Sequence, residues 1–151
     1  MSETSKDIER LFEPGREETL EAYLRLLHPV DLAELFDHVD ERYWKHITSC
    51  LDAEKLAETL SHLDDGIQEK LGSLLKIDRL AAAVEELETD DAADFLGELS
   101  SERASAVLAK LDDEDRGDIE TLLSYPEDSA GGLMQTELCM VEEGLLVSDA
   151  I

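Results

Sequence analysis

Residues 51–75 read LDAEKLAETLSHLDDGIQEKLGSLL, with leucine at 51, 63 and 75. The same twelve-residue spacing extends in both directions and gives nine large aliphatic positions: Leu27, Val39, Leu51, Leu63, Leu75, Leu87, Leu99, Leu111 and Leu123. Twelve residues are too few for two helices and too many for a heptad, but they fit one helix of about two turns and a turn of about four residues. The spacing therefore predicts an all-α solenoid of short helices with a roughly 12-residue repeat, which we expect to wind as a right-handed superhelix.

Polar turns separate the aliphatic positions and mark where each helix is expected to begin. They lie at residues 40–42, 52–54, 64–66, 76–78, 88–90, 100–102 and 112–114. Asp and Ser accept backbone N–H bonds at helix starts, and acidic residues in the first turn favour the helix dipole. Between the turns, sets such as Leu56, Leu60 and Leu63 form one narrow apolar stripe per helix. Helices this short are unstable alone, so we expect the array to fold as a unit over residues 27–123.

Residues 1–26 are predicted to form a helical entry segment ahead of the array. A first helix carries Ile8, Leu11 and Phe12 at i, i+3 and i+4, and Pro14-Gly15 breaks it. A second helix is expected from about residue 16 to residue 27, where His28-Pro29 stops it.

The composition is strongly acidic, with 39 acids against 13 bases in 151 residues and a formal charge of -26. Such a charge repels nucleic acid and anionic membrane surfaces, and it destabilises the compact state by self-repulsion. A bound cation is the simplest compensation. The alternative is that the acids only keep the protein soluble or reflect a salt-adapted source. The 42% of hydrophobic residues suffices for one well-cored domain.

Several common features are missing from the sequence. The start, MSETSKDIERLFEPG, is polar, and no apolar run approaches the roughly 18 residues that span a bilayer, so we expect a soluble chain. Cys50 and Cys139 lie far apart without metal-type spacing and are interpreted as reduced, packing thiols.

The four histidines lack paired metal spacing and are interpreted as packing or surface residues: His28, His38, His46 and His62. No nucleophile–base pair, glycine-rich phosphate loop or CxxC motif occurs, and we therefore expect no enzymatic activity.

The repeat ends after Leu123. Residues 124–136 are interpreted as a junction linker, in which glycines allow unusual backbone dihedral angles. Residues 137–151 begin with a short apolar run typical of a strand and end with the start of a helix, which together are too little for a stable domain. We expect the sequence to be a fragment that stops inside a second domain.

The end of the chain resembles a known family. Residues 125–134, YPEDSAGGLM, look like the junction segment of the MgtE family of magnesium transporters. Residues 141–151, VEEGLLVSDAI, are similar to the opening of the CBS domain that follows this junction in the family. The acidic helical array is similar to the family's cytosolic N-terminal domain, so the resemblance covers nearly the whole chain.

The resemblance implies a sensor domain on the cytoplasmic face of the membrane, within a homodimeric Mg²⁺ channel. Mg²⁺ bound between this domain and the CBS domains would favour a closed pore, and loss of Mg²⁺ would let the domain swing away. By match to the family's motifs, the Mg²⁺ contacts would be Glu58, Asp90, Asp94 and the backbone carbonyl of Gly132. The partners would be the CBS and pore domains of the same full-length protein.

The acidic residues agree with this implication on their own chemistry. Mg²⁺ takes oxygen ligands and keeps several waters, so one or two carboxylates per ion suffice. Asp90 and Asp94 lie at i and i+4, where like charges destabilise a helix unless a cation neutralises them.

Simpler structural roles remain open for the same residues. Asp90 or Thr89 caps a helix, Glu58 pairs with Lys55, and Gly131-Gly132 serves only as a hinge. For the acidic turns at 64–66 and 112–114, capping is the favoured interpretation.

A second function competes with ion sensing. Flagellar motor switch proteins carry similar short-helix arrays, and a solenoid surface can grip a partner helix. On that hypothesis the chain is a protein–protein interaction scaffold with no ion sensing.

Overall fold

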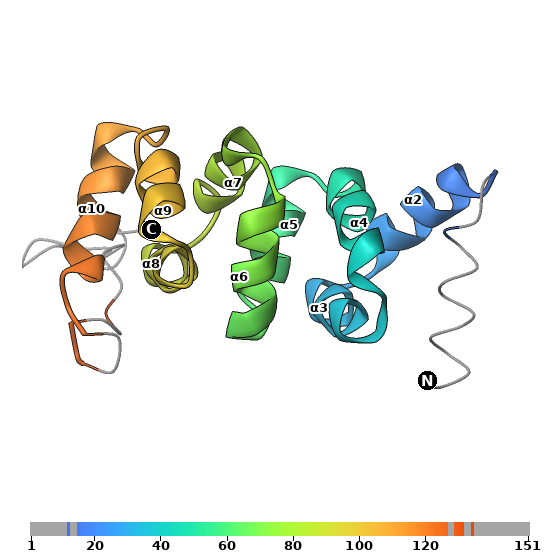
Figure 1. The fold of residues 1–151 in the computed structure, drawn as a ribbon, viewed down its shortest axis with the longest axis horizontal. Coiled ribbons are helices and arrows are strands. Elements are labelled where there is room, and N and C mark those ends of the chain that lie inside the picture. The colour runs from blue at the N-terminus through green and yellow to red at the C-terminus, as the bar shows by residue number, and fades with distance from the viewer. Residues whose placement is uncertain (1–11, 13–14, 127–128, 132–133, 135–151) are drawn as a thin grey trace, which may run out of the picture.

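The computed structural model describes residues 12, 15–126, 129–131 and 134, and within them the chain is all helical with no strand. Figure 1 shows the helices following one another in chain order along the long axis of an elongated molecule, from α2 to α10. One short 3-10 helix, η2 (Glu41–Tyr43), precedes α4. The α-helices are α2 (Glu17–Leu26), α3 (Pro29–His38), α4 (Trp44–Cys50), α5 (Ala53–Leu60), α6 (Asp65–Leu74), α7 (Ile77–Val84), α8 (Thr89–Gly97), α9 (Ser101–Leu108) and α10 (Asp113–Leu123).

The helix starts follow the twelve-residue period of the sequence. The N-cap residues, which precede the helix starts, are also spaced twelve residues apart: Arg16, His28, Asp40, Asp52, Asp64, Lys76, Glu88, Ser100 and Asp112. The predicted side-chain caps form at Asp40, at Asp52, which accepts from Lys55 N at 2.9 Å, and at Asp112. Asp64 and Ser100 occupy the same position without a side-chain cap bond, so capping was only partly right.

At seven of the nine twelfth positions, the backbone N–H of the aliphatic residue donates to a carbonyl in the last turn of the helix before it. The backbone N–H of Leu75 donates to Leu71 O at 2.9 Å, and that of Leu63 donates to Leu60 O at 3.2 Å. The side chains of both leucines are buried. Leu123 departs from this pattern because it is the last residue of α10 and stays 38% exposed at the end of the array.

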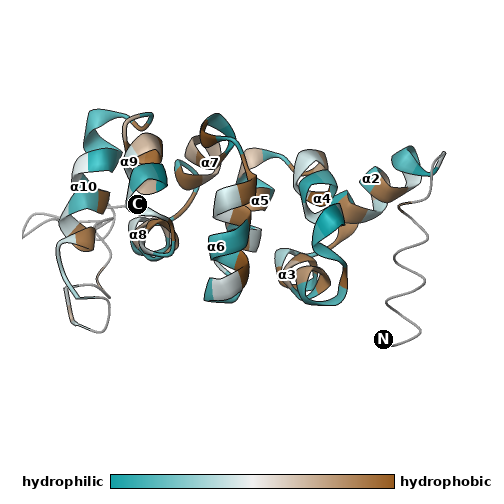
Figure 2. Cartoon of the chain, in the orientation of Figure 1, coloured by the Kyte–Doolittle hydropathy of each residue, from teal (hydrophilic) through white to brown (hydrophobic). Residues whose placement is uncertain are grey.

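Packing adds a period that the sequence analysis did not anticipate. The helices contact next-but-one neighbours: α3, α5, α7 and α9 form one row, α6, α8 and α10 form a second, and α2 contacts α4. The structural unit is therefore a pair of helices, 24 residues long. The brown and teal segments in Figure 2 show that each helix carries both apolar and polar residues. Such amphipathic helices can bury one face against a neighbour and expose the other. The right-handed winding stays a prediction.

Basic residues repeat with this 24-residue period, and each connects its helix to the end of the α-helix three earlier in the chain. Lys55, Arg79 and Arg103 each occupy the third position of their helix, in α5, α7 and α9. Lys55 Nζ donates to Arg25 O at 2.6 Å, and Arg103 donates to Leu75 O. A cation there opposes the dipole of its own helix but covers carbonyls at the C-terminal end of an earlier helix, where positive charge is favourable.

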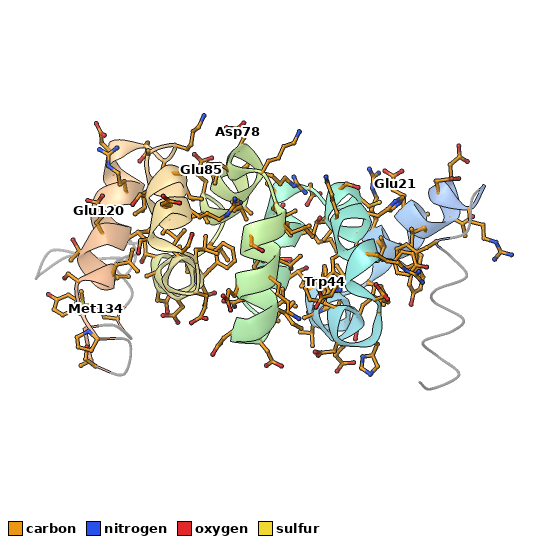
Figure 3. All side chains as sticks on the ribbon, viewed as in Figure 1. Glu21, Trp44, Asp78, Glu85, Glu120 and Met134 are labelled. Carbon is orange, nitrogen blue, oxygen red and sulfur yellow. The ribbon has the colours of Figure 1, made fainter. Side chains whose placement is uncertain are left out.

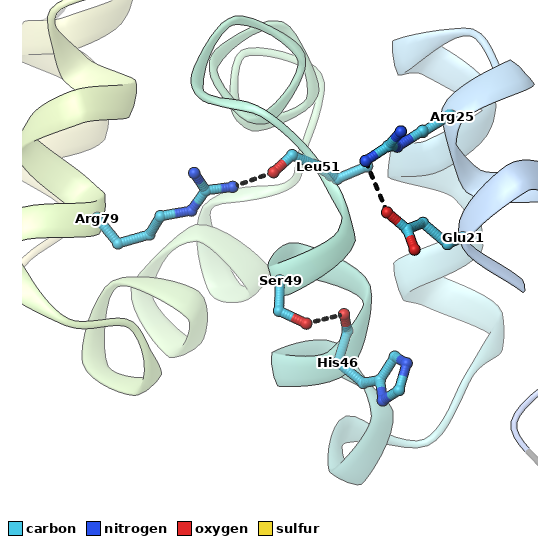
Figure 4. Close-up of polar contacts among 6 residues, drawn as sticks. All are labelled: Glu21, Arg25, His46, Ser49, Leu51 and Arg79. Atoms are coloured by element: carbon cyan, nitrogen blue, oxygen red, sulfur yellow. Dashed lines mark hydrogen bonds and ion pairs between the residues drawn. The ribbon is translucent and has the colours of Figure 1, made fainter. Parts of the chain in front are cut away.

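Arg79 makes the most complete of these contacts (Figure 4). Its guanidinium donates to Thr48 O at 3.0 Å, to Leu51 O at 2.5 Å and to Asp52 O at 3.3 Å. These carbonyls lie at the end of α4 and the start of the following turn, so one side chain connects α7 to the α4–α5 turn.

Close packing of the second row depends on a glycine. Gly72 of α6 is buried, and a Cβ atom at this position would overlap Leu99 Cδ2 after α8. The backbone of Gly72 is helical, so its dihedral angles do not require glycine. Glycine is required because a larger residue would prevent the close approach of Leu99. Elsewhere the core consists mainly of leucine and alanine. Trp44, labelled in Figure 3, contacts Phe36 edge-to-face with 5.7 Å between ring centroids.

The two ends of the chain test the remaining expectations about organisation. Gly15 has φ of 88° and turns the chain before α2, which agrees with the predicted break at Pro14-Gly15. Phe12 stacks on Tyr43 with 4.2 Å between ring centroids. Gly131 does not adopt a left-handed conformation, so the expectation of unusual dihedrals is wrong there, and its lack of a side chain instead admits the Tyr125 ring.

The predicted strand and truncated CBS domain at 137–151 lie outside the described residues, as do Ile8, Leu11 and Cys139. Cys50 forms no disulfide within the described part, and burial raises the pKa of its thiol. None of the described helices is both long and apolar enough to cross a membrane.

Replacing Arg79 by methionine should lower the free energy of unfolding by about 1–3 kcal/mol, because it removes charge-assisted hydrogen bonds to several carbonyls. Urea unfolding followed by circular dichroism measures this. The control Arg42→Met changes an exposed arginine and should stay within about 0.5 kcal/mol of the parent. Equal effects of the two substitutions would contradict the assigned role of Arg79.

Gly72→Ala should destabilise the fold by about 1–3 kcal/mol, because the added methyl group must displace Leu99. The control Gly117→Ala lies in α10 with open space around the new Cβ and should stabilise by about 0.5–1 kcal/mol. Thermal unfolding of both variants gives the comparison. A stable Gly72→Ala protein would show that α6 and α8 are not closely packed.

Candidate functional site

Acidic side chains line a groove between the end of α5 and the turn that leads into α8. The groove has a volume of about 340 Å³. Its carboxylates come from Glu58 on α5, from Glu86 and Glu88 in the turn, and from Asp91 on α8. His28 and His62 also line it, and both are exposed as expected for surface histidines.

A second acidic groove adjoins the first, and the two share Ser61 and Asp91. It has a volume of about 190 Å³ and is lined by three further carboxylates, Asp65, Asp94 and Glu98. Beside it, buried Gln68 donates from Nε2 to Leu60 O at 2.9 Å and to Leu63 O at 3.2 Å, which fixes the α5–α6 turn. The two grooves together form a continuous acidic surface across α5, α6 and α8.

Asp91 lines both grooves, and the pKa of its carboxyl is shifted by burial and by nearby negative charge. Partial burial raises the pKa of its carboxyl above the ordinary value of 3.8, and the negative charges of Asp90, Glu88 and Asp94 raise it further. His62 acts in the opposite direction as the smallest contribution. Ionised Asp91 therefore lies in an unfavourable negative field, which a bound cation would relieve.

The structure separates the predicted site residues into different environments. Glu58 is exposed and lines the first groove, while Asp94 is exposed and lines the second. Asp90 lies one turn before Asp94 on α8, half-buried, and its Oδ1 is buried without a hydrogen-bond partner in the described part of the chain. Gly132 lies outside the described residues.

Two of the simpler structural roles do not hold in this geometry. Lys55 donates to Arg25 O, and no ion pair joins it to Glu58 among the described residues. The N-cap of α8 is Glu88, so Thr89 and Asp90 lie inside the first turn and neither is the capping residue.

Sequence reasoning missed Asp91, together with Glu86 and Glu88. A usable signal was present, because residues 85–94 contain six acids and no base. The motif match selected Asp90 and Asp94 from this run. Asp94 lines the second groove, whereas the first groove is lined by Glu86, Glu88 and Asp91. Only the packing of α5 near the α7–α8 turn shows which acids face Glu58.

The carboxylates line the grooves without converging on one point. Within the described residues, no group of three or more His, Cys, Asp or Glu side chains is placed to hold a metal ion. Mg²⁺ does not need such a cage, because it retains water and binds through one or two carboxylates. The donor set therefore fits one side of a hydrated divalent-cation site rather than a complete site.

Comparison with known proteins decides the family. The profile of the MgtE intracellular N domain matches residues 27–128. The chain belongs to this family. The matched segment contains the array from its first aliphatic position and both acidic grooves, so the resemblance inferred from the junction motif is confirmed. A search of curated proteins found no match.

Solved structures agree with the family. The cytosolic domain of the Mg²⁺ channel MgtE in complex with ATP is 32% identical, with a TM-score of 0.77 over 87% of this chain and 54% of that one. The soluble part of a magnesium transporter is 22% identical and shares the fold, with a TM-score of 0.76 over 89% of this chain and 54% of that one. The chain thus spans about half the length of these proteins. The family is a transporter domain, not an enzyme family.

Asp91→Asn should stabilise the fold at neutral pH by up to about 1 kcal/mol, the range of exposed charge interactions. A carboxyl with a raised folded-state pKa binds more protons folded than unfolded, so its contribution becomes unfavourable as pH rises through that pKa. The advantage of the variant should therefore vanish below about pH 3.8, where Asp91 is protonated in both states. Urea unfolding across this range measures the difference.

Exposed Glu120 on α10 supplies the matched control (Figure 3). Glu120→Gln should show no comparable pH-dependent difference. An Asp91→Asn protein that is less stable than the parent at pH 7 would contradict the electrostatic account of the grooves.

Proposed function

We propose that this domain senses Mg²⁺ for a magnesium transporter and closes its pore when Mg²⁺ bridges the acidic surface to CBS domains. The observation that carries the proposal is the position of Asp91 between two acidic grooves, with its carboxyl held in an unfavourable negative field. Membership of the MgtE intracellular N domain family supports the assignment to magnesium transport.

The mechanism follows from electrostatic repulsion between facing acidic surfaces. Two unit charges about 4 Å apart interact by roughly 4 kcal/mol at an effective dielectric constant near 20. A hydrated Mg²⁺ between two such surfaces replaces this repulsion with attraction on both sides. A few bridges therefore supply the ~5.5 kcal/mol that moves a two-state equilibrium from 1:99 to 99:1.

The residues assigned to the ions combine the resemblance with the geometry. Glu58 and Asp94 line adjoining grooves, and Asp90 presents a buried oxygen without a hydrogen-bond partner among the described residues. To these we add Asp91, which borders both grooves. The backbone carbonyl of Gly132 stays in the proposed set by motif match alone.

The proposal makes the second half of each ion site part of the same longer protein. CBS domains would face the acidic surface, a pore domain would respond to their movement, and two copies would assemble as a homodimer on the cytoplasmic face of the membrane. Since one face supplies only one or two carboxylates per ion, this domain alone should bind Mg²⁺ weakly, in about the millimolar range.

Titration of the chain with Mg²⁺ at constant ionic strength, followed by NMR, tests the proposal, with K⁺ as the competing ion. Amide shifts should saturate with Mg²⁺ at residues 58 and 88–94 and remain small with K⁺. Glu58→Gln combined with Asp91→Asn should weaken the apparent affinity by about tenfold, while Glu120→Gln leaves it unchanged.

Shifts of equal size with Mg²⁺ and K⁺ would indicate screening alone. If a full-length protein with CBS domains also shows equal shifts with Mg²⁺ and K⁺, ion sensing is excluded. The alternative function, a protein–protein interaction scaffold, would then be favoured.

A further inference from the structure

An apolar groove with a basic rim lies away from the acidic surface. It is formed by α4, the end of α6 and the start of α7, and its volume is about 220 Å³. Leu74 and Leu75 contribute its apolar lining, and Leu74 is 41% exposed although it is a large aliphatic residue. Thr48 and Ser49 complete the α4 side, where Ser49 Oγ donates to His46 O at 2.7 Å (Figure 4).

The charge of this groove is opposite to that of the chain. Its charged lining residues are Lys45, Lys76 and Arg79, with no acid among them. The chain as a whole has 39 acids and only 13 bases, so a groove with only basic charges departs sharply from the rest of the surface.

Two of the three cations lack an internal role. Arg79 is committed to backbone carbonyls of Thr48, Leu51 and Asp52. Lys45 and Lys76 are exposed, and neither forms an ion pair within the part of the chain that the structure describes. Their ammonium groups therefore remain available beside an exposed leucine.

We propose that this groove docks a short acidic, amphipathic helical segment of a partner protein. One large apolar side chain of the segment would cover Leu74, and flanking carboxylates would meet Lys45 and Lys76. Both features match the helix-in-groove mode of recognition, in which apolar anchors give affinity and charges give orientation.

The overall charge favours a short peptide over extended anions. A membrane surface or nucleic acid would bring many negative charges against a chain of -26 and be repelled. A short segment is held within a Debye length of about 8–10 Å of the groove and senses mainly the local basic rim. The groove uses α4, α6 and α7, so its occupation does not depend on the proposed Mg²⁺ sensing.

Fluorescence anisotropy with a labelled helical peptide tests the proposal on the full 151-residue chain. The probe carries leucines at i, i+3 and i+7 with glutamates beside them, and a second probe replaces every glutamate by glutamine. The acidic probe should bind saturably and more tightly than the neutral probe. Its affinity should fall as NaCl rises.

Substitutions locate the binding surface. Leu74→Gln, and separately Lys45→Gln with Lys76→Gln, should each weaken binding by at least about tenfold. Leu26→Gln changes a leucine that is 86% exposed outside this groove, and Arg116→Gln changes a base on α10 that pairs with Asp113, so both controls should bind as the unsubstituted chain does.

Three results would overturn the proposal. The first is absence of saturable binding by the acidic probe. The second is binding that the Leu74 and lysine variants leave unchanged. The third is self-association of the parent chain that Leu74→Gln abolishes in analytical ultracentrifugation, which would assign the groove to a second copy.

Discussion

The fold depends on the contact that each helix makes with its next-but-one neighbour. A helix of seven to eleven residues has little stability alone, since nucleation is costly and few hydrogen bonds offset it. Stacking supplies the missing free energy by burying one apolar stripe per helix, and the aliphatic residue at the twelfth position closes most of the helix ends. Lys55, Arg79 and Arg103 then cover carbonyls at the ends of earlier helices. The acidic surface is positioned by this packing, because its carboxylates come from helices and turns that share no hydrogen-bonded sheet.

The helical array was largely predictable because each twelve-residue unit carries the same kind of residue at the same position. A large aliphatic residue at every twelfth position located most helix ends, and Asp40, Asp52 and Asp112 acted as caps where expected. The arrangement in two rows was not predictable from that spacing, because the same pattern fits helices stacked singly or in pairs. The 24-residue spacing of Lys55, Arg79 and Arg103 held the missing information. A base in the first turn of a helix is unfavourable for the dipole of that helix, so these residues are explained only by their tertiary contacts.

The acidic character of the surface was predictable from the sequence, but which acids line the grooves was predictable only in part. An excess of acid indicated a cation, and the family resemblance selected Glu58, Asp90 and Asp94. The helical geometry then distributed these residues over different environments and brought Asp91 to the junction of the grooves. Neighbouring carboxylates on one helix point in directions 100° apart, so a sequence run cannot show which of them faces a groove. Burial and mutual repulsion, which depend on packing, identify Asp91 as the strained member.

We propose that Mg²⁺ binds between this acidic surface and CBS domains of a full-length transporter, and the compactness of that full-length protein tests the proposal most directly. Small-angle X-ray scattering of the parent protein in detergent, at constant ionic strength, reports its radius of gyration with Mg²⁺ and with K⁺. The account predicts a smaller radius in Mg²⁺ than in K⁺, and loss of that difference when Glu58→Gln and Asp91→Asn are combined. A radius that is the same in both ions would contradict it.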